Sequence, residues 1–214
     1  MITNIQSYYQ QNNLKKHYDF LENLYQTKKF PKALLLTGNK GEGKFTLINH
    51  FMHNIYDKPN YDIKKNIITK GGIFHKQFLD DIYPNIIYLN GVAFESVKIE
   101  DIRNLKSQLF TKPINENKRF IILDDVEIFN LNSLNALLKL IEEPYKDNFF
   151  ILINNNTRPI LETVKSRCLE IKIFLKKDSK KNVINYLLDY FNVEKIFNED
   201  FVNTSPGNFV KFNY

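Results

Sequence analysis

The stretch LTGNKGEGKFTLINHF holds the most specific pattern for chemistry in the chain. Gly38, Gly43 and Lys44 fit G-x-x-x-x-G-K-[ST], in which backbone N–H groups, a helix N-terminus and the lysine ammonium bind phosphate oxygens. The next residue should be a hydroxyl that coordinates Mg²⁺, but it is Phe45. Thr46 has a hydroxyl one position late, and a helix turns by about 100° per residue, so we expect it to point elsewhere. The pattern predicts a loop that binds phosphate without efficient hydrolysis, and a purely structural loop is the alternative.

A second candidate site lies where the apolar stretch FIILDD ends in two acids, Asp124 and Asp125. Ligands bind outside the carboxyl ends of strands in parallel sheets, so the position of these acids suits a binding site. Beside a phosphate loop, Asp124 would contact Mg²⁺ through water, and the following acid would polarise an attacking water. Asp125 is one methylene shorter than a glutamate, which shortens its reach toward that water. The alternative is a pair of acids solvated at a strand end.

A third candidate is the arginine in the stretch ETVKSRCLEI. An arginine at the edge of a nucleotide-binding subunit can reach the γ-phosphate of a neighbour and neutralise charge in the transition state. Arg167 would need an oligomer for this role. The alternatives are that Arg167 is a surface charge and that the adjacent Cys168 fills space in the core.

The elements that would position these side chains alternate along the chain. Short apolar stretches predict strands at 32–38, 85–91, 118–125, 147–156 and 169–174. Helical spacing and stop signals predict helices at 13–27, 46–56, 96–110, 133–144 and 159–168. Residues 57–83 predict connecting structure with a short helix, and the segment after residue 175 reads as all-helical. The alternation predicts an α/β fold with a parallel sheet in three layers.

Composition narrows the class of protein. Hydrophobic residues make up 43% of the 214 residues, which supports a real core and argues against wholesale disorder. The single cysteine excludes an internal disulfide and a Cys-based zinc site. The N-terminus lacks the apolar segment of a signal peptide, and no apolar stretch approaches the roughly 20 residues that span a bilayer. We expect a cytoplasmic protein with no membrane contact. The net charge of +6 permits contact with nucleic acid, but the sequence has no aromatic–basic motif that would recognise it.

Together these stretches resemble the AAA+ subunits of sliding-clamp loaders. LTGNKGEGKFTL, FIILDDVE, LNALLKLIEEP and ILETVKSRC are similar to that family in order and spacing, as is the lead-in KIEDIRNLKSQLFTKP. The similarity is greatest to the delta-prime subunits of bacterial DNA polymerase III and covers roughly residues 13–210. It implies an α/β fold of the P-loop AAA+ type over residues 1–175, a three-layer parallel sheet, and a small helical lid at 176–214. The collar domain of the family is absent from these residues.

The resemblance implies a role for each matching position. The loop matches the Walker A motif, the two acids match Walker B, and Asn155 falls at the sensor-1 position. Arg167, in Ser-Arg-Cys, matches an arginine finger, which would be catalytic in trans. At the sensor-2 position, where an arginine is expected, the sequence has Gly207. The implied nucleotide-binding residues are Gly38, Asn39, Lys40, Gly41, Glu42, Gly43, Lys44, Phe45, Thr46, Asp124, Asp125 and Asn155.

The resemblance implies a delta-prime-like subunit that supports loading of the sliding clamp onto DNA and supplies an arginine finger to a neighbouring ATPase subunit. ATP binding would be weak or absent, Mg²⁺ would not bind, and the four-Cys zinc module of many relatives is missing. The implied partners are gamma/tau and delta type subunits, with the sliding clamp and primer-template DNA reached through the complex. The alternative is an autonomous P-loop ATPase, which Phe45, Asp125 and Gly207 argue against.

Overall fold

The computed structural model describes residues 14–69, 71–91, 97, 99–114, 118–196 and 204–213. They form two compact units, and each is described by itself. Unit 1 comprises the described residues within Met1–Lys29, Gly38–His75 and Ile173–Tyr214. Unit 2 comprises those within Phe30–Thr37 and Lys76–Lys172. The candidate loop therefore belongs to unit 1, while the two acids and Arg167 belong to unit 2. The predicted boundary between residues 175 and 176 stays a prediction.

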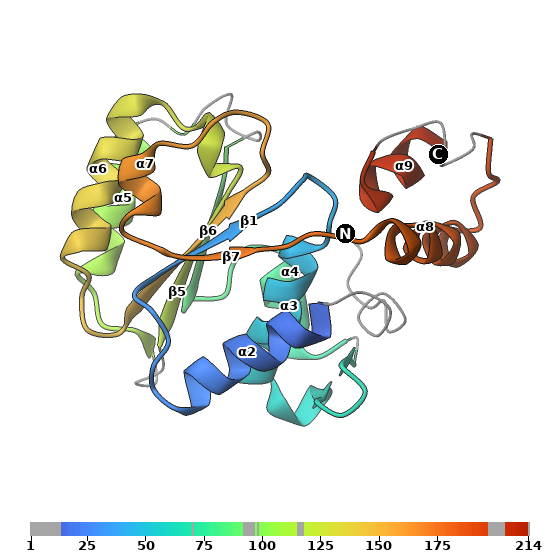
Figure 1. Cartoon of the computed structure of the whole chain (residues 1–214). Helices are drawn as coiled ribbons and strands as arrows, with labels where there is room; N and C mark the ends of the chain where they lie inside the picture. Colours follow the sequence, from blue (N-terminus) through green and yellow to red (C-terminus); the bar gives the residue numbers. More distant parts are fainter. Residues whose placement is uncertain are drawn as a thin grey trace. The chain divides into compact units, whose positions relative to one another are not determined.

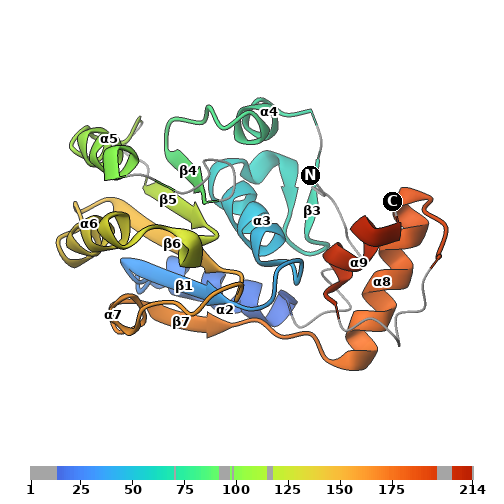
Figure 2. The same ribbon diagram turned by 90° about the horizontal axis from the view of Figure 1, so that it is seen from above.

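Unit 2 is built on a five-stranded parallel sheet, as the strand–helix alternation predicts. The strands are β1 (Ala33–Thr37), β4 (Ile86–Asn90), β5 (Arg119–Asp124), β6 (Asn148–Asn154) and β7 (Leu169–Lys172). They lie in the order β4-β5-β6-β1-β7, which Figure 2 shows from above. All four neighbouring pairs are parallel, so the carboxyl ends of the strands meet at one edge. The five predicted strands are confirmed, each slightly shorter than its predicted range.

Three helices cover one face of this sheet: α5 (Ile99–Leu109), α6 (Leu131–Glu142) and α7 (Glu162–Lys165) (Figure 1). Alternate strand residues such as Leu35, Leu123 and Leu152 pack against them in one buried cluster. The residues between them on the strands, such as Leu36 and Ile153, are buried as well. Parallel sheets are covered on both faces, which is why their strands are apolar throughout rather than alternating with polar residues.

The ends of α6 and α7 follow from local signals. The side chain of Asn130 caps α6 by accepting from the N–H of Ser133 at 2.9 Å, and Pro144 follows two residues after the helix. The predicted helix at 159–168 is wrong in extent, because α7 has only four residues. After it, the N–H groups of Arg167 and Cys168 bond to carbonyls three residues back, a tighter turn than an α-helix makes.

Unit 1 is mainly helical. Its elements are α2 (Leu14–Gln26), α3 (Lys44–Tyr56), the 3₁₀ turn η1 (Lys58–Asn60), the strands β2 (Tyr61–Asp62) and β3 (Ile67–Ile68), α8 (Lys177–Phe191) and α9 (Pro206–Asn213). Helix α4 (Ile73–Leu79) begins in unit 1 and ends in unit 2. Helices α8 and α9 lie side by side (Figures 1 and 2), which agrees with the predicted all-helical segment. The predicted helix starts at residues 13 and 96 lie outside the described residues.

Within residues 57–83, helix α4 agrees with the predicted short helix, but the small antiparallel hairpin β2–β3 was not predicted. The turn of the hairpin is formed by Asp62, whose Oδ1 accepts from the N–H groups of Lys64 at 2.9 Å and Lys65 at 3.0 Å. Asn66 closes the turn with a φ of 51°. Asp and Asn favour such turns, but strands of two residues leave no periodic pattern to detect.

Candidate functional site

The candidate phosphate loop runs from Gly38 to Gly43 and leads directly into α3. Gly41 and Gly43 have φ values of 88° and 92°, in the left-handed region that glycine adopts without strain. Gly43 is the N-cap of α3, and its carbonyl accepts the N–H of Leu47 at 2.9 Å. The strand–loop–helix order on which the motif depends is therefore present, with β1 ending at Thr37.

Two charged side chains of the loop are bonded inside it. Lys44 is 3% exposed, and its Nζ donates to the carbonyls of Gly38 at 2.7 Å and Asn39 at 2.8 Å. Glu42 is 6% exposed, and its carboxylate accepts from the backbone N–H of Asn39 at 2.8 Å and from its Nδ2 at 3.2 Å. A phosphate entering the loop would meet the negative charge of Glu42. Phe45 supplies no oxygen to a cation at the position where the motif has a hydroxyl.

The first turn of α9 lies against this loop. The Ser205 hydroxyl donates to the carbonyl of Lys40, and the N–H of Gly207 donates to the carbonyl of Gly41 at 3.2 Å. A Cβ added to Gly207 would lie 3.1 Å from Gly41 Cα, and one added to Gly41 would lie 2.4 Å from Ser205 Oγ. The close approach of the two backbones therefore leaves little room for a side chain at Gly207, the position where the resemblance leads one to expect an arginine.

In unit 2, three predicted site residues come together. Asp124 ends β5, and Asp125 follows it with a left-handed φ of 53°. The Nδ2 of Asn155 donates to both acids, at 3.0 Å to Asp124 Oδ1 and 2.8 Å to Asp125 Oδ1. Burial, and then the charge of Asp125, raise the pKa of Asp124. One amide group thus links the two carboxylates, which lie at the edge of the sheet where the strands end.

Four further residues belong to this acidic cluster, and the sequence reasoning missed them. Tyr88 Oη donates to Asp124 Oδ2 at 3.1 Å and accepts from Asn90 Nδ2 at 3.0 Å. Glu127 accepts from the Thr157 hydroxyl at 2.7 Å and from the N–H of Asn155 at 3.1 Å. A usable signal for Tyr88 and Asn90 was their place at the carboxyl end of the neighbouring strand β4. Glu127 follows Asp125 by two residues, and no pattern in the sequence indicates its partners.

Arg167 lies just after α7 and takes its partners from α6 and α7 rather than from the acidic cluster. Its side chain is 37% exposed. The Nε donates to Glu142 Oε1 at 2.5 Å, and Nη1 donates to the carbonyl of Thr163 at 3.0 Å and to Ser166 Oγ at 3.3 Å. Cys168 is half-buried against the core, and burial raises the pKa of its thiol to about 11. Cys168 therefore fills space, as the alternative reading of this residue holds.

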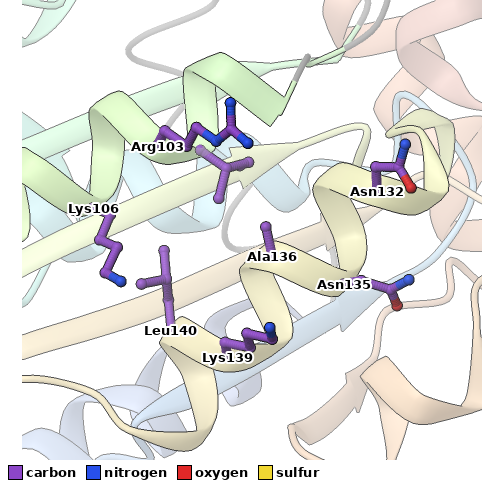
Figure 3. A pocket seen from close by; sticks show the side chains of 8 residues that line it. Arg103, Lys106, Asn132, Asn135, Ala136, Lys139 and Leu140 are labelled. Atoms are coloured by element: carbon purple, nitrogen blue, oxygen red, sulfur yellow. The ribbon is translucent and has the colours of Figure 1, made fainter.

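A basic groove of about 380 Å³ separates α5 from α6. Arg103 and Lys106 line it from α5 and Lys139 from α6 (Figure 3). The remaining lining residues are Ile102, Asn132, Asn135, Ala136 and Leu140. The lining itself includes no carboxylate, and among the described residues the acidic partner of its cations is the exposed Glu100 on α5, 3.5 Å from Arg103 Nη1, so the groove keeps an excess of positive charge. The sequence reasoning missed this site, because a net charge says nothing of where the charges gather.

Two classes of site are not seen in the part of the chain that the structure describes. There, no group of three or more His, Cys, Asp or Glu side chains is placed to hold a metal ion. Among the same residues, no helix has both the length and the apolar character needed to cross a membrane. The expectations of no zinc and no Mg²⁺ stay predictions.

The parallel sheet, with a G-x-x-x-x-G-K loop and helix following β1, defines an α/β fold of the P-loop AAA+ class. The solved structure of the RuvB Holliday junction branch migration motor from Thermotoga maritima is similar, with a TM-score of 0.53. The match covers 85% of this chain and 51% of that chain at 18% identity, so it shows the fold alone.

The model of the family described as DNA polymerase III, delta subunit, matches residues 13–177, and the chain belongs to this family. One relative is the DNA polymerase III subunit gamma of Buchnera aphidicola from Schizaphis graminum, 27% identical over 78% of this chain and 44% of the relative. Another, from the same organism, is DNA polymerase III subunit delta', 27% identical over 81% of this chain and 55% of the relative. The chain spans about half the length of these curated relatives.

Proposed function

We propose that this protein is a delta-prime-like subunit of the clamp loader of bacterial DNA polymerase III and supports loading of the sliding clamp onto DNA. In this proposal Arg167 acts on the nucleotide of a neighbouring ATPase subunit, in a complex with gamma/tau and delta type subunits in the cytoplasm. The observation that carries the proposal is the half-exposed guanidinium of Arg167, held in place at the end of α7, in a chain whose own loop has Phe45 where a Mg²⁺ ligand belongs. Membership of the family and relatives named gamma, tau and delta' support it.

The chain's own ATP hydrolysis is absent in this proposal, and ATP binding is weak. Phe45 stands where the motif has its Mg²⁺ ligand, and Glu42 places a carboxylate inside the loop. Asp124 and Asp125 both accept hydrogen bonds from Asn155. The Lys44→Ala variant tests the remaining phosphate contact: a thermal shift with ATP in the wild type that the variant lacks would show that the loop binds nucleotide. A Mg²⁺-dependent turnover of about one per second or faster by the isolated chain would favour the autonomous ATPase instead.

The decisive experiment is ATP hydrolysis by a reconstituted clamp loader that contains this chain. Arg167→Ala should lower turnover at the neighbouring site by about 10³–10⁵, the contribution of an arginine finger. Arg167→Lys should recover little, because an ammonium lacks the planar fork of guanidinium. Arg158→Ala is a matched control, since Arg158 is an exposed arginine of the same unit in the loop after β6. Unchanged turnover and unchanged clamp loading with Arg167→Ala would leave this residue a surface charge.

The groove between α5 and α6 supports contact with primer-template DNA through the complex. Its three cations, with Arg103 exchanging its exposed pairing to Glu100 for a phosphate, would neutralise phosphates and release counterions, so binding should weaken as salt rises. Replacing Arg103, Lys106 and Lys139 by alanine should reduce the slope of log K against log salt by about 2.7, which is 0.9 for each lost phosphate contact. A control with the same loss of charge replaces Lys64, Lys65 and Lys76. If both triple variants change the slope equally, the groove has no special role.

A further inference from the structure

We infer that Glu142 is a positioning residue for Arg167, an inference that rests on the proposed role of that arginine. Glu142 is the last residue of α6 and lies 25 residues before Arg167 in the chain. Its carboxylate accepts from Nε of Arg167 and thereby sets the direction in which the guanidinium points.

The guanidinium is held on two of its three nitrogen atoms. Nε donates to Glu142 Oε1 at 2.5 Å, and Nη1 donates to the Thr163 carbonyl at 3.0 Å and to Ser166 Oγ at 3.3 Å. Nη2 donates to none of the residues that the structure describes. Because the group is planar, fixing Nε and Nη1 fixes Nη2 as well. The donor that is left over is presented outward for a phosphate oxygen of a docking partner.

The two elements that supply the anchors are themselves fixed by the core. Ile141, beside Glu142, is 5% exposed, and Val164, beside Thr163, is fully buried in the same cluster. Helix α6 ends at Glu142, and Pro144 follows two residues later. The proline disfavours a longer helix, so Glu142 stays at the helix end. The distance between the backbone of Glu142 and the carbonyl of Thr163 is therefore set by the packing of α6 and α7 in the core.

This arrangement orders the Arg167 side chain before a partner docks, and it adds little to folding stability. Exposed ion pairs contribute little to stability, and both partners here are more than a third exposed. An arginine that is free in solution must be ordered when a partner docks, which weakens the interaction it makes in the transition state. An arginine that is already held avoids that loss. Glu142 should thus affect the rate at the neighbouring site while leaving the fold unchanged.

The test is ATP hydrolysis at saturating ATP by the reconstituted complex that contains the full chain. Glu142→Ala should lower kcat by about threefold to tenfold, the effect of losing the prior ordering of one long side chain. The KM for ATP should not change, because the neighbour binds its own nucleotide. Glu142→Gln should recover most of the rate, since the amide oxygen still accepts from Nε. Glu143→Ala is the matched control, because the Glu143 side chain has no hydrogen bond or ion pair to the described residues.

Two outcomes overturn the inference while the proposed function survives. If Arg167→Ala abolishes stimulation but Glu142→Ala leaves kcat unchanged, the carboxylate does not position the arginine. If Glu142→Ala raises kcat, the carboxylate restrains the arginine instead. Unchanged hydrolysis with Arg167→Ala is the distinct failure of the proposed function and overturns the inference with it. The NMR order parameter of the Arg167 Nε–H bond in the isolated chain gives a second readout. It should fall in Glu142→Ala and stay unchanged in Glu143→Ala. Equal order parameters in the two variants would contradict positioning.

Discussion

Removing the amide of Asn155 should destabilise the protein, because this one group bonds both acids of the cluster. Asn155→Ala deletes the bond of 3.0 Å to Asp124 and the bond of 2.8 Å to Asp125. Hydrogen bonds to charged groups contribute about 1.5–3 kcal/mol each. Asp125 is only 2% exposed, so water cannot fully replace its lost donor. With the lower value for each bond, we expect a loss of about 3 kcal/mol in the free energy of unfolding.

The size and the pH dependence of this loss can both be measured. For a chain of this length, about 3 kcal/mol corresponds to a fall in Tm of roughly 6–12 °C. Burial and the charge of Asp125 raise the pKa of Asp124, whereas the Asn155 bond lowers it. The variant should therefore have a higher pKa at Asp124 than the wild type. A carboxyl whose folded pKa is raised destabilises the fold above that pKa and ceases to do so when protonated. The deficit should be largest at about pH 7 and smaller at about pH 4.5.

Urea unfolding at both pH values provides the assay, with Asn135→Ala as the control. Asn135 is exposed on α6, and its replacement should change the free energy of unfolding by no more than about 0.5 kcal/mol. Asn155→Asp should cost more than Asn155→Ala, because it adds a third acid beside two others. A loss below about 1 kcal/mol for Asn155→Ala, or a loss that does not depend on pH, would refute the view that the amide holds the two carboxylates together.

Two further predictions concern unit 1. Burial lowers the pKa of His50 to about 3 and that of His53 to about 4, so both stay neutral in the fold, whereas the unfolded chain binds protons below about pH 6.5. The free energy of unfolding should thus fall as the pH drops from about 7 to 4, and less steeply in a His50→Gln/His53→Gln variant; equal slopes in urea unfolding would contradict this. Gly207→Ala should loosen the first turn of α9, because its Cβ would lie 3.1 Å from Gly41 Cα. Hydrogen exchange of the α9 amides should then be faster than in the wild type or in the exposed control Lys211→Ala.

The sequence was sufficient to predict the parallel sheet and part of the candidate site. A parallel strand is buried on both faces, so FIILDD is apolar along its whole length and its end is easy to place. The acids at that end therefore had a predictable position. The family resemblance named Asn155 as a nucleotide-binding residue, and its bonds to the two acids come from the structure alone. The bond that Tyr88 donates to Asp124 depends on strand order, and the bond that Glu127 accepts from Asn155 depends on the path of a loop; neither can be deduced from local periodicity.

The same limit applies to the ion pair between Glu142 and Arg167. The two residues are 25 positions apart and come from different helices, so no pattern of spacing links them. The sequence predicts that each is polar and lies near a helix end, which is true of many surface residues. Only the packing of α6 and α7 on one core brings the carboxylate within 2.5 Å of the guanidinium.

The structure also changes how the G-x-x-x-x-G-K motif at residues 38–44 should be interpreted. Gly43 has a φ of 92°, in the left-handed region that glycine adopts without strain, and Lys44 is buried with its ammonium bonded to two carbonyls of the loop itself. Both residues thus have structural reasons to be present even in a chain that never hydrolyses ATP. No such structural reason requires a hydroxyl at the position of Phe45, because the hydroxyl of the motif serves to bind Mg²⁺. A motif that keeps its glycine and lysine but loses its hydroxyl is therefore what structural requirements alone would leave behind, and the glycines and the lysine are no evidence for catalysis by this chain.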